Sequence, residues 1–499
     1  MKESLAKNFI KEKHIPITFP IKVFVDLFQK VAGFGVEPRK KEIKMKKVGF
    51  VSLGCSKNLI DTEIMLKHLM DAGYEITPEE TDADAVIINT CAFIESAKKE
   101  SIDNIIDIGW LKKHHKLKAI IVTGCLAERY REQILTELDE VDAIIGVGSI
   151  HKIVEAVDAA LENAGKKAKD AKKYSCFDDK EASVIGGERI VTTGDGMAYL
   201  KIAEGCSNRC TYCAIPQIRG KMRSRTMKDI IEEATMLDSM GIKELNLIAQ
   251  DTSAYGIDLY GKYELPELIR GICDATNIPW IRLLYCYPDK ITDELVEEIK
   301  NNPRVVKYID IPIQHISDHM LSSMNRHGDS KMIRDNIAKL RTIPGIVLRT
   351  TAIIGFPGET DEDFTELCEF VKEAKFERFG AFTYSREEDT PAYDMPDQID
   401  EQLKQDRYDI LMQTQVGVSE AYNESRIGKT YKVLCEGYDP VAEAHVGRSY
   451  AEAADIDGKI WFTCDDPKLR IAEGEIIDVK ITEAMDYDLV GEAIITPYA

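Results

Sequence analysis

The segment that decides the fold is AYLKIAEGCSNRCTYCAIPQIRGKMRSR (198–225), in which a strand-like run leads into a loop with three closely spaced cysteines. The run AYLKIA (198–203) is short and mostly apolar, which is typical of a buried strand. Cys206, Cys210 and Cys213 follow it with the spacing C-x-x-x-C-x-x-C. Thiolates are the usual ligands of a 4Fe–4S cluster, and three of them on one tight loop hold three of its irons. The fourth iron is then open to a substrate or cofactor.

The alternative for this loop is a structural zinc site. Such a site normally needs four ligands in paired spacing. No fourth Cys or His lies nearby in the sequence, and the spacing of Cys206, Cys210 and Cys213 is unusual for zinc. The loop therefore favours an iron–sulfur cluster.

The region around this loop, about residues 195–425, alternates strand-like and helix-like patterns. Helical patterns include Met227–Met240 and Asp361–Ala374. The candidate strands are 198–203, 244–250, 280–285, 308–313, 346–356 and 379–384. Such an alternation predicts a parallel (β/α) barrel, partial or complete. A helix around 400–425 ends this domain, and the strand-like alternation with Gly-Asp turns in 426–499 predicts a small β-barrel.

The region before the loop predicts another α/β domain, residues 45–164. Its short β-branched runs are 48–54, 85–90, 119–124 and 143–148, separated by helical patterns such as 61–72, 95–110 and 151–164. Strands recurring at this interval are typical of βαβ units, so we expect a doubly wound domain. Residues 165–194 are polar and aperiodic in their first part, as in a linker. The whole chain is thus expected to be a multidomain α/β protein.

A second set of cysteines is visible only when the predicted strands are considered. Cys55, Cys91 and Cys125 each come directly after one of the first three strands of the 45–164 domain. The carboxyl ends of parallel strands lie at one edge of the sheet, so the three thiols are expected to converge there. The alternative is that each is a small buried side chain, as free cysteines often are. Three in equivalent positions favour a second cluster.

Composition limits the function classes. The 499 residues carry a formal net charge of −21, which argues against a general affinity for nucleic acid. The absence of an apolar run of about 20 residues and of a signal-peptide core predicts a soluble, cytoplasmic protein that acts without a membrane. Twelve cysteines in so long a chain do not suggest a disulfide framework.

Residues 1–44 differ from the rest, with ten Lys/Arg against five Asp/Glu. An amphipathic arm that binds a surface is one interpretation. The other is an extension, not native or disordered, that precedes a natural start at Met45.

The segment EGCSNRCTYCAIPQIRGKMRSR (204–225) resembles the motif of the radical S-adenosylmethionine superfamily, in its methylthiotransferase branch. The resemblance implies that S-adenosylmethionine binds the open iron and is cleaved by one electron to a 5′-deoxyadenosyl radical, which makes Cys206, Cys210 and Cys213 the catalytic cysteines. It also implies that Tyr212 lies beside the adenine. Further cofactor-lining positions implied by the resemblance are Gln250, Asp251, Gly355, Gly358 and Glu359.

Methylthiotransferases carry a three-cysteine auxiliary cluster in their N-terminal domain, which agrees with Cys55, Cys91 and Cys125 as iron ligands. The resemblance thus implies two 4Fe–4S clusters and S-adenosylmethionine as cofactors, and an electron donor such as flavodoxin or ferredoxin. The stretches VSLGCSKNLIDTE (51–63), PIQHISDHMLSSMNR (312–326) and DYDLVGE (486–492) resemble the RimO-type group, which modifies an aspartate of small-subunit ribosomal protein S twelve.

The terminal β-domain resembles the TRAM module, which helps tRNA-modifying relatives hold RNA. Residues 426–499 carry eight Lys/Arg against fifteen Asp/Glu, a balance that suits a basic ribosomal protein better than tRNA. No tRNA is therefore expected as a partner. The alternatives are a tRNA adenosine methylthiotransferase and a non-catalytic iron–sulfur electron carrier.

Overall fold

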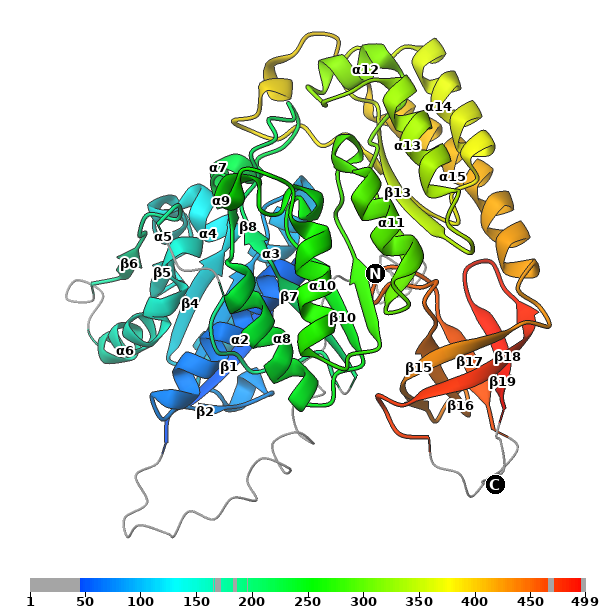
Figure 1. Cartoon of the computed structure of the whole chain (residues 1–499). Coiled ribbons are helices and arrows are strands. Elements are labelled where there is room, and N and C mark those ends of the chain that lie inside the picture. Colours follow the sequence, from blue (N-terminus) through cyan, green and yellow to red (C-terminus); the bar gives the residue numbers. More distant parts are fainter. Residues whose placement is uncertain are drawn as a thin grey trace, which may run out of the picture. The chain divides into compact units, whose positions relative to one another are not determined.

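The computed structural model describes residues 45–164, 166, 172–182, 186–194, 196–464 and 471–494 (Figure 1). The expected extension at 1–44 lies outside these residues. The described chain forms two compact units. The first comprises the residues up to Ala92, Ser96–Asp178 and Glu188–Ile190, and the second comprises Phe93–Glu95, Asp179–Gly187 and the chain from Val191 onward.

The first unit is built on a parallel sheet. Its strands, as far as the structure describes them, run in the order β2-β1-β3-β4-β5-β6. They are β1 (Lys47–Ser52), β2 (Glu75–Ile76), β3 (Ala85–Thr90), β4 (Ala119–Gly124), β5 (Ala143–Ile145) and β6 (Tyr174–Cys176). All residues of β3 and β4 are buried, which explains their continuous apolar sequences. The reversal of strand order at β1 confirms the doubly wound fold.

Helices cover this sheet. The larger ones are α2 (Ser56–Asp71), α3 (Glu95–His114) and α6 (Ile153–Asn163), and α4 (Cys125–Tyr130) and α5 (Glu132–Glu137) are short. The structure differs from expectation at β6, which lies in the segment expected to be a linker. This strand pairs with β5 through the backbone at the sheet edge, and its three residues, Tyr-Ser-Cys, are only partly buried or exposed. So short and polar a strand leaves no apolar pattern in the sequence.

The second unit contains the larger parallel sheet. In the described residues its strands follow the sequential order β14-β13-β12-β11-β10-β7, an open arrangement that confirms the partial barrel. The strands are β7 (Met197–Lys201), β10 (Glu244–Ile248), β11 (Trp280–Leu283), β12 (Val305–Asp310), β13 (Val347–Ile354) and β14 (Arg378–Thr383). The short strands β8 (Ala203–Glu204) and β9 (Arg223–Ser224) pair separately.

The helices of the barrel alternate with its strands. They are α7 (Ile215–Arg219), α8 (Met227–Ser239), α9 (Ile257–Tyr260), α10 (Leu265–Ala275), α11 (Asp293–Asn301), α12 (Asp318–Ser323), α13 (Ser330–Leu340) and α14 (Asp361–Ala374). Threonine caps begin several of them: the side chains of Thr226, Thr292 and Thr360 each accept a hydrogen bond from the third residue of the helix. Such caps satisfy N–H groups that have no partner within the helix.

Helix α15 (Glu401–Glu424) leads from the barrel to the C-terminal β-domain. Although it has 24 residues, it is largely polar. Of the helices in the described parts of the chain, none combines the length and the apolar character needed to cross a membrane.

The C-terminal β-domain is a closed barrel, as expected. Its described strands connect in the order β15-β16-β17-β19-β18, and their apolar side chains form a separate core. The strands are β15 (Thr430–Asp439), β16 (Ala444–Arg448), β17 (Ile460–Thr463), β18 (Ile476–Ala484) and β19 (Leu489–Ala493).

The segment Arg448–Asp457 of this small barrel binds the parallel strands of the same unit through polar contacts with mostly buried side chains of the strands. The strand residues that reach it are Tyr199, Glu244, Arg282, Tyr308, Arg349 and Arg378. Each of the strands β7 and β10 to β14 therefore contributes one side chain. The contacts fix the small barrel to the parallel sheet.

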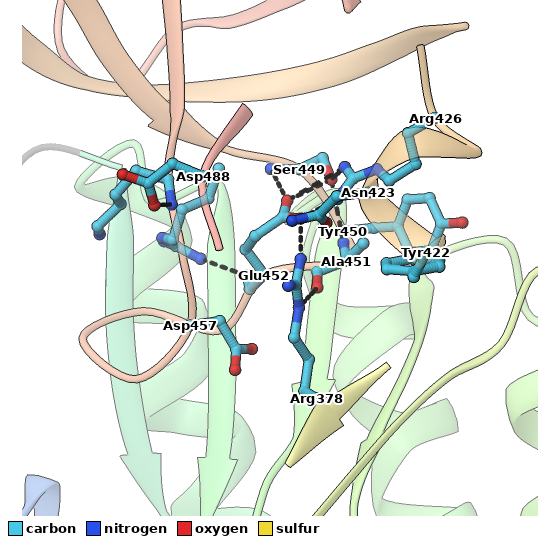
Figure 2. Close-up of polar contacts among 12 residues, drawn as sticks. Arg378, Tyr422, Asn423, Arg426, Ser449, Tyr450, Ala451, Glu452, Asp457 and Asp488 are labelled. Carbon is cyan, nitrogen blue, oxygen red and sulfur yellow. Dashed lines mark hydrogen bonds and ion pairs between the residues drawn. The ribbon is translucent and has the colours of Figure 1, made fainter. Parts of the chain in front are cut away.

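Glu452 is central to this junction. Figure 2 shows its carboxylate between Arg378, which comes from β14, and Arg426, which follows α15. Arg378 Nη2 lies 2.7 Å from Glu452 Oε1, and the Ser449 hydroxyl donates to Oε2 at 2.6 Å. Burial by itself would raise the pKa of Glu452, but the two guanidinium groups outweigh burial and hold the pKa well below its usual range.

We expect Glu452→Gln to destabilise the second unit by about 3–5 kcal/mol, because it leaves two buried guanidinium groups without their counter-charge. The matched control is Asp478→Asn, which breaks the exposed Lys432–Asp478 pair (3.4 Å) and should cost less than about 1 kcal/mol. Denaturant unfolding measures both changes. Equal midpoints for the two variants would show that the buried pair does not hold the junction.

Candidate functional site

The loop with Cys206, Cys210 and Cys213 lies between β8 and α7, beyond the carboxyl end of β7. Its ends are fixed by the backbone, since Cys206 N–H donates to Gly220 O and Cys213 N–H to Cys210 O, both at 3.1 Å. Gly205 has φ +80°, and a Cβ there would stand 2.1 Å from Lys221 O, so this position requires glycine. Cys210 is buried, and Cys206 and Cys213 are half-buried. The loop thus presents three thiols at the end of the partial barrel where ligands bind.

Asp251, one of the expected cofactor-lining residues, supports this loop. Its Oδ2 accepts a hydrogen bond from Asn208 Nδ2 at 2.7 Å and lies 2.9 Å from Lys290 Nζ. Lys290 Nζ also donates to Asn208 Oδ1 at 3.1 Å. The structure therefore brings Asp251 to the cysteine loop, where its carboxylate holds the segment between Cys206 and Cys210.

Gln250 belongs to a neighbouring polar group around Glu204. Its Nε2 donates to Glu204 Oε1 at 2.5 Å, and Glu204 Oε2 lies 2.8 Å from Lys201 Nζ and 3.2 Å from Arg219 Nη1. Burial by itself would raise the pKa of Glu204, but the positive charges of Lys201 and Arg219 keep this pKa well below its usual range. Gln250 Oε1 is buried without a hydrogen-bond partner, so an acceptor remains available for a ligand.

Tyr212 and Arg326 lie on another side of the loop. The Tyr212 hydroxyl accepts from Arg326 Nη1 at 3.2 Å, and its ring meets Phe356 edge-on at 6.5 Å. Cys210 Sγ lies 3.0 Å from the Tyr287 hydroxyl. The half-buried Tyr212 ring offers the flat apolar surface that an adenine needs.

The GFPGE turn follows β13. Gly355 (φ +70°) donates its N–H to Glu359 Oε2 at 2.9 Å, while Arg407 Nη1 lies 2.7 Å from Glu359 Oε1. Both carboxylate oxygens of Glu359 are thus engaged, one with the backbone of the turn and the other with Arg407 of α15. Gly358 has φ +81°, and no atom lies within 4 Å of a Cβ placed there. The backbone at Gly358 therefore leaves space for a bound molecule.

His315 lies in the loop between β12 and α12, contacts this turn and had no assigned role in the sequence. It is fully buried, and its Nδ1 accepts from Ser317 N–H at 3.1 Å, so the proton of the neutral ring is on Nε2. Nε2 lies 3.7 Å from Glu359 Oε2, too far for a hydrogen bond, and has no hydrogen-bond partner. Burial lowers the pKa of His315 to about 4.

The second set of cysteines lies in the first unit. Cys55 follows β1 and precedes α2, Cys91 directly follows β3, and Cys125 follows β4 as the first residue of α4. These three strands are neighbours in the sheet. A Cβ on Gly54 would come within 3.3 Å of Cys91 Sγ, so the Cys55 loop packs directly against Cys91.

Asn58 connects the three loops. Its Nδ2 donates to Leu53 O and to Thr90 O, both at 2.9 Å, and its Oδ1 accepts from Cys125 Sγ at 3.7 Å. Cys91 is held further by Ser101, which accepts from its N–H and donates to its carbonyl, each at 3.0 Å. Asn58 and Ser101 could not be identified from the sequence, because a polar residue inside a helix has no distinctive signal.

The three thiols of each set could each bind a separate metal atom. Within the described residues, no group of three His, Cys, Asp or Glu side chains is arranged to hold one metal ion. A 4Fe–4S cluster does not need that convergence, because each thiolate binds its own iron. Burial raises the pKa of Cys206 to about 11, so iron binding there must displace a proton.

Three family models match the chain in order. They are the uncharacterized protein family UPF0004 at residues 47–146, the radical SAM superfamily at 200–371 and the TRAM domain at 427–494. The match at 200–371 includes Cys206, Cys210, Cys213 and the GFPGE turn.

Similar proteins cover most of the chain. Ribosomal protein uS12 methylthiotransferase RimO from Thermoanaerobacter sp. is 50% identical over 448 residues, which is 90% of this chain and 100% of that protein. The protein of the same name from Acetivibrio thermocellus is 48% identical over 450 residues, 90% of this chain and 98% of that protein. Among solved structures, the radical S-adenosylmethionine methyltransferase TsrM from Kitasatospora setae has a TM-score of 0.51 and 16% identity, over 70% of this chain and 77% of that one. That likeness concerns the fold alone.

The burial of His315 predicts a dependence of stability on pH. Because its pKa is about 4 in the folded state and 6.5 otherwise, the unfolded chain takes up the proton first as pH falls. The stability contributed by neutral His315 should therefore fall by about 2 kcal/mol between pH 7 and pH 5. His315→Asn cannot titrate and should lose less stability than the wild type over this range, as measured by denaturant unfolding. The exposed His327, changed to Asn, is the control. Parallel pH profiles of wild type and His315→Asn would contradict the assignment.

Proposed function

Because the chain belongs to the family of ribosomal protein uS12 methylthiotransferases named RimO, we propose that it methylthiolates the β-carbon of an aspartate in uS12 with two 4Fe–4S clusters. It is accordingly a radical S-adenosylmethionine transferase. The single observation that carries the proposal is that each unit has a set of three cysteines: one set follows three neighbouring parallel strands, and the other lies on one loop beyond the carboxyl end of β7.

The two cysteine sets have different roles in the proposed reaction. Cys206, Cys210 and Cys213 hold the cluster that binds S-adenosylmethionine, and Cys55, Cys91 and Cys125 hold the auxiliary cluster that serves the transferred sulfur. When bound, the first cluster supplies one electron, from a donor such as flavodoxin or ferredoxin, to cleave S-adenosylmethionine to the 5′-deoxyadenosyl radical. A β-carbon of aspartate has no leaving group and no readily removed proton, so acid–base chemistry alone cannot place sulfur there.

The chain's own residues position the reactants. Asp251 and Lys290 hold the cysteine loop through Asn208, Tyr212 supports the adenine, and Gln250 offers its unpartnered Oε1 to the cofactor. The turn at Gly355–Glu359 leaves room beside Gly358 for the rest of the cofactor. The hydrogen of the substrate would leave in 5′-deoxyadenosine, and the resulting carbon radical would form its C–S bond to sulfur held at the auxiliary cluster, which would take up the remaining electron. A second S-adenosylmethionine would supply the methyl group and leave as S-adenosylhomocysteine.

The surface of the C-terminal barrel supports a basic protein as substrate. Arg426 and Arg448 are fully buried in ion pairs, so neither is available to a phosphate. The exposed acidic residues that the structure describes there are Glu443, Asp455, Glu473, Glu475, Asp478, Glu483, Asp486 and Glu492, whereas the exposed Lys residues are Lys429, Lys432 and Lys480. Such a surface repels RNA and attracts a basic ribosomal protein.

The two alternatives predict different features. A tRNA adenosine methylthiotransferase would be expected to expose more Lys and Arg than acidic residues on this barrel, whereas the exposed charged residues described there are mostly acidic. A non-catalytic electron carrier would need neither the turn beside Gly358 nor the polar group around Gln250.

Two cysteine variants test the division of work. Cys210→Ala should abolish both 5′-deoxyadenosine formation and methylthiolated uS12, because it removes a ligand of the cluster that generates the radical. Cys91→Ala should keep much of the cofactor cleavage and lose the product, because only the sulfur site is damaged. Anaerobically reconstituted proteins, a reductant and mass spectrometry of both products provide the measurement.

The matched control is Cys273→Ala, at a half-buried cysteine in α10 that belongs to neither set. It should retain both products. If Cys91→Ala still formed methylthiolated uS12, the auxiliary cluster would not be at Cys91.

A further inference from the structure

Arg326 is a buried cation without a carboxylate partner beside the cysteine loop. It is 8% exposed, and its guanidinium contacts three neutral groups. Nη1 donates to the Tyr212 hydroxyl at 3.2 Å, Nη2 donates to Pro312 O at 2.5 Å, and the group lies 3.9 Å from the centre of the Tyr287 ring. Among the ion pairs of the described residues, none includes Arg326.

An unpaired charge in this position is unusual. Arginine stays protonated at any accessible pH, and a buried charge is costly unless an opposite charge faces it. The other buried arginines of the second unit follow this rule: Arg282 pairs with Glu244 at 2.5 Å, and Arg407 pairs with Glu359. No described side chain therefore supplies the negative charge that would pair with Arg326.

A second buried cation near the loop, Lys290, is already neutralised. Lys290 Nζ lies 4.2 Å from the centre of the same Tyr287 ring, but it pairs with Asp251 at 2.9 Å and with Asp289 at 3.3 Å. Of these two buried cations, Arg326 is therefore the one without a carboxylate partner among the described residues.

Tyr287 and Tyr212 place this charge close to the cysteines. The Tyr287 hydroxyl lies 3.0 Å from Cys210 Sγ, and its ring faces Arg326. Tyr212, the other phenol bound to Arg326, lies between Cys210 and Cys213 in the sequence. One layer of aromatic rings therefore separates the guanidinium from the site of the cluster.

We propose that Arg326 is the positioning residue whose charge balances the iron–sulfur cluster of the Cys206 loop and favours its reduced state. The inference rests on the proposed function, because it requires a cluster at that loop. Three thiolates outweigh the charge of the oxidised cluster core, and the incoming electron adds a further negative charge. A fixed, desolvated cation nearby stabilises the reduced cluster more than the oxidised one and raises the reduction potential.

The test measures the cluster potential rather than turnover. In the full-length protein with Cys55, Cys91 and Cys125 changed to Ala, only the cluster of interest remains. A redox titration followed by electron paramagnetic resonance, without S-adenosylmethionine, then compares Arg326→Gln with its parent. At a fixed potential we expect the ratio of reduced to oxidised cluster to fall about tenfold, equivalent to 59 mV for a one-electron couple.

Two further variants make the result specific. Arg326→Lys keeps the charge and should keep a potential near that of the parent. Arg334→Gln is the matched control, because Arg334 also faces an aromatic ring, Phe370 at 4.6 Å, but lies on α13 and pairs with Glu373. Its potential should not change.

An unchanged potential in Arg326→Gln with full iron content would overturn the inference, and would indicate a role confined to packing or to the carboxylate of the cofactor. If Arg326→Gln loses the cluster, Arg326→Lys decides: a potential near that of the parent supports the role of the charge, and loss of the cluster there too contradicts it. A parent protein without a 4Fe–4S signal would overturn the proposed function itself.

Discussion

Parallel strands bring every loop that follows them to the same edge of a sheet. The convergence of Cys55, Cys91 and Cys125 depends on this constraint, and so do the contacts that support the Cys206 loop. In the first unit, β1, β3 and β4 are hydrogen-bonded neighbours, so residues separated by more than thirty positions in sequence end beside one another. Asn58 then joins their loops through two carbonyls and one thiol. In the second unit, the loop after β7 meets Asp251 from the loop after β10 and Lys290 from beyond β11. The parallel strands thus bring the candidate functional side chains of each unit close together.

The opposite edge of the larger sheet has a different role. There the buried side chains are charged or phenolic, and they bind the segment Arg448–Asp457 of the small barrel. Buried ion pairs of this kind add little net stability over apolar packing, but they are costly to break singly and define one arrangement of the partners. Because Arg426 and Arg448 are buried in this junction, their charges do not offset those of the exposed acidic residues of the small barrel.

Much of this organisation could be predicted from the sequence. The runs at 85–90 and 119–124 coincide with β3 and β4, because strands buried on both faces are apolar throughout. The position of each cysteine after a strand was likewise visible in the sequence. Strand β6 was not, because an edge strand of three polar residues is held by its backbone pairing with β5.

The residues that support the candidate site were the least predictable. Asn58, Glu204 and Arg326 act through partners that are distant in sequence, and an isolated polar residue has no pattern that reveals such a partner. The roles expected for Asp251 and Glu359 were also incomplete. Their carboxylates hold the cysteine loop and close the GFPGE turn, respectively, and this depends on Lys290 and Arg407 being folded against them.

The central claim is that the chain modifies a ribosomal protein rather than tRNA. Mass spectrometry of uS12 and of bulk tRNA from a strain lacking the gene, with and without the wild-type chain restored, tests it most directly. If the chain modifies uS12, the methylthio group should disappear from an aspartate of uS12 in the deletion strain and return with the wild-type chain. The tRNA adenosines should be unaffected. Loss of the methylthio group from tRNA adenosine alone would contradict the claim.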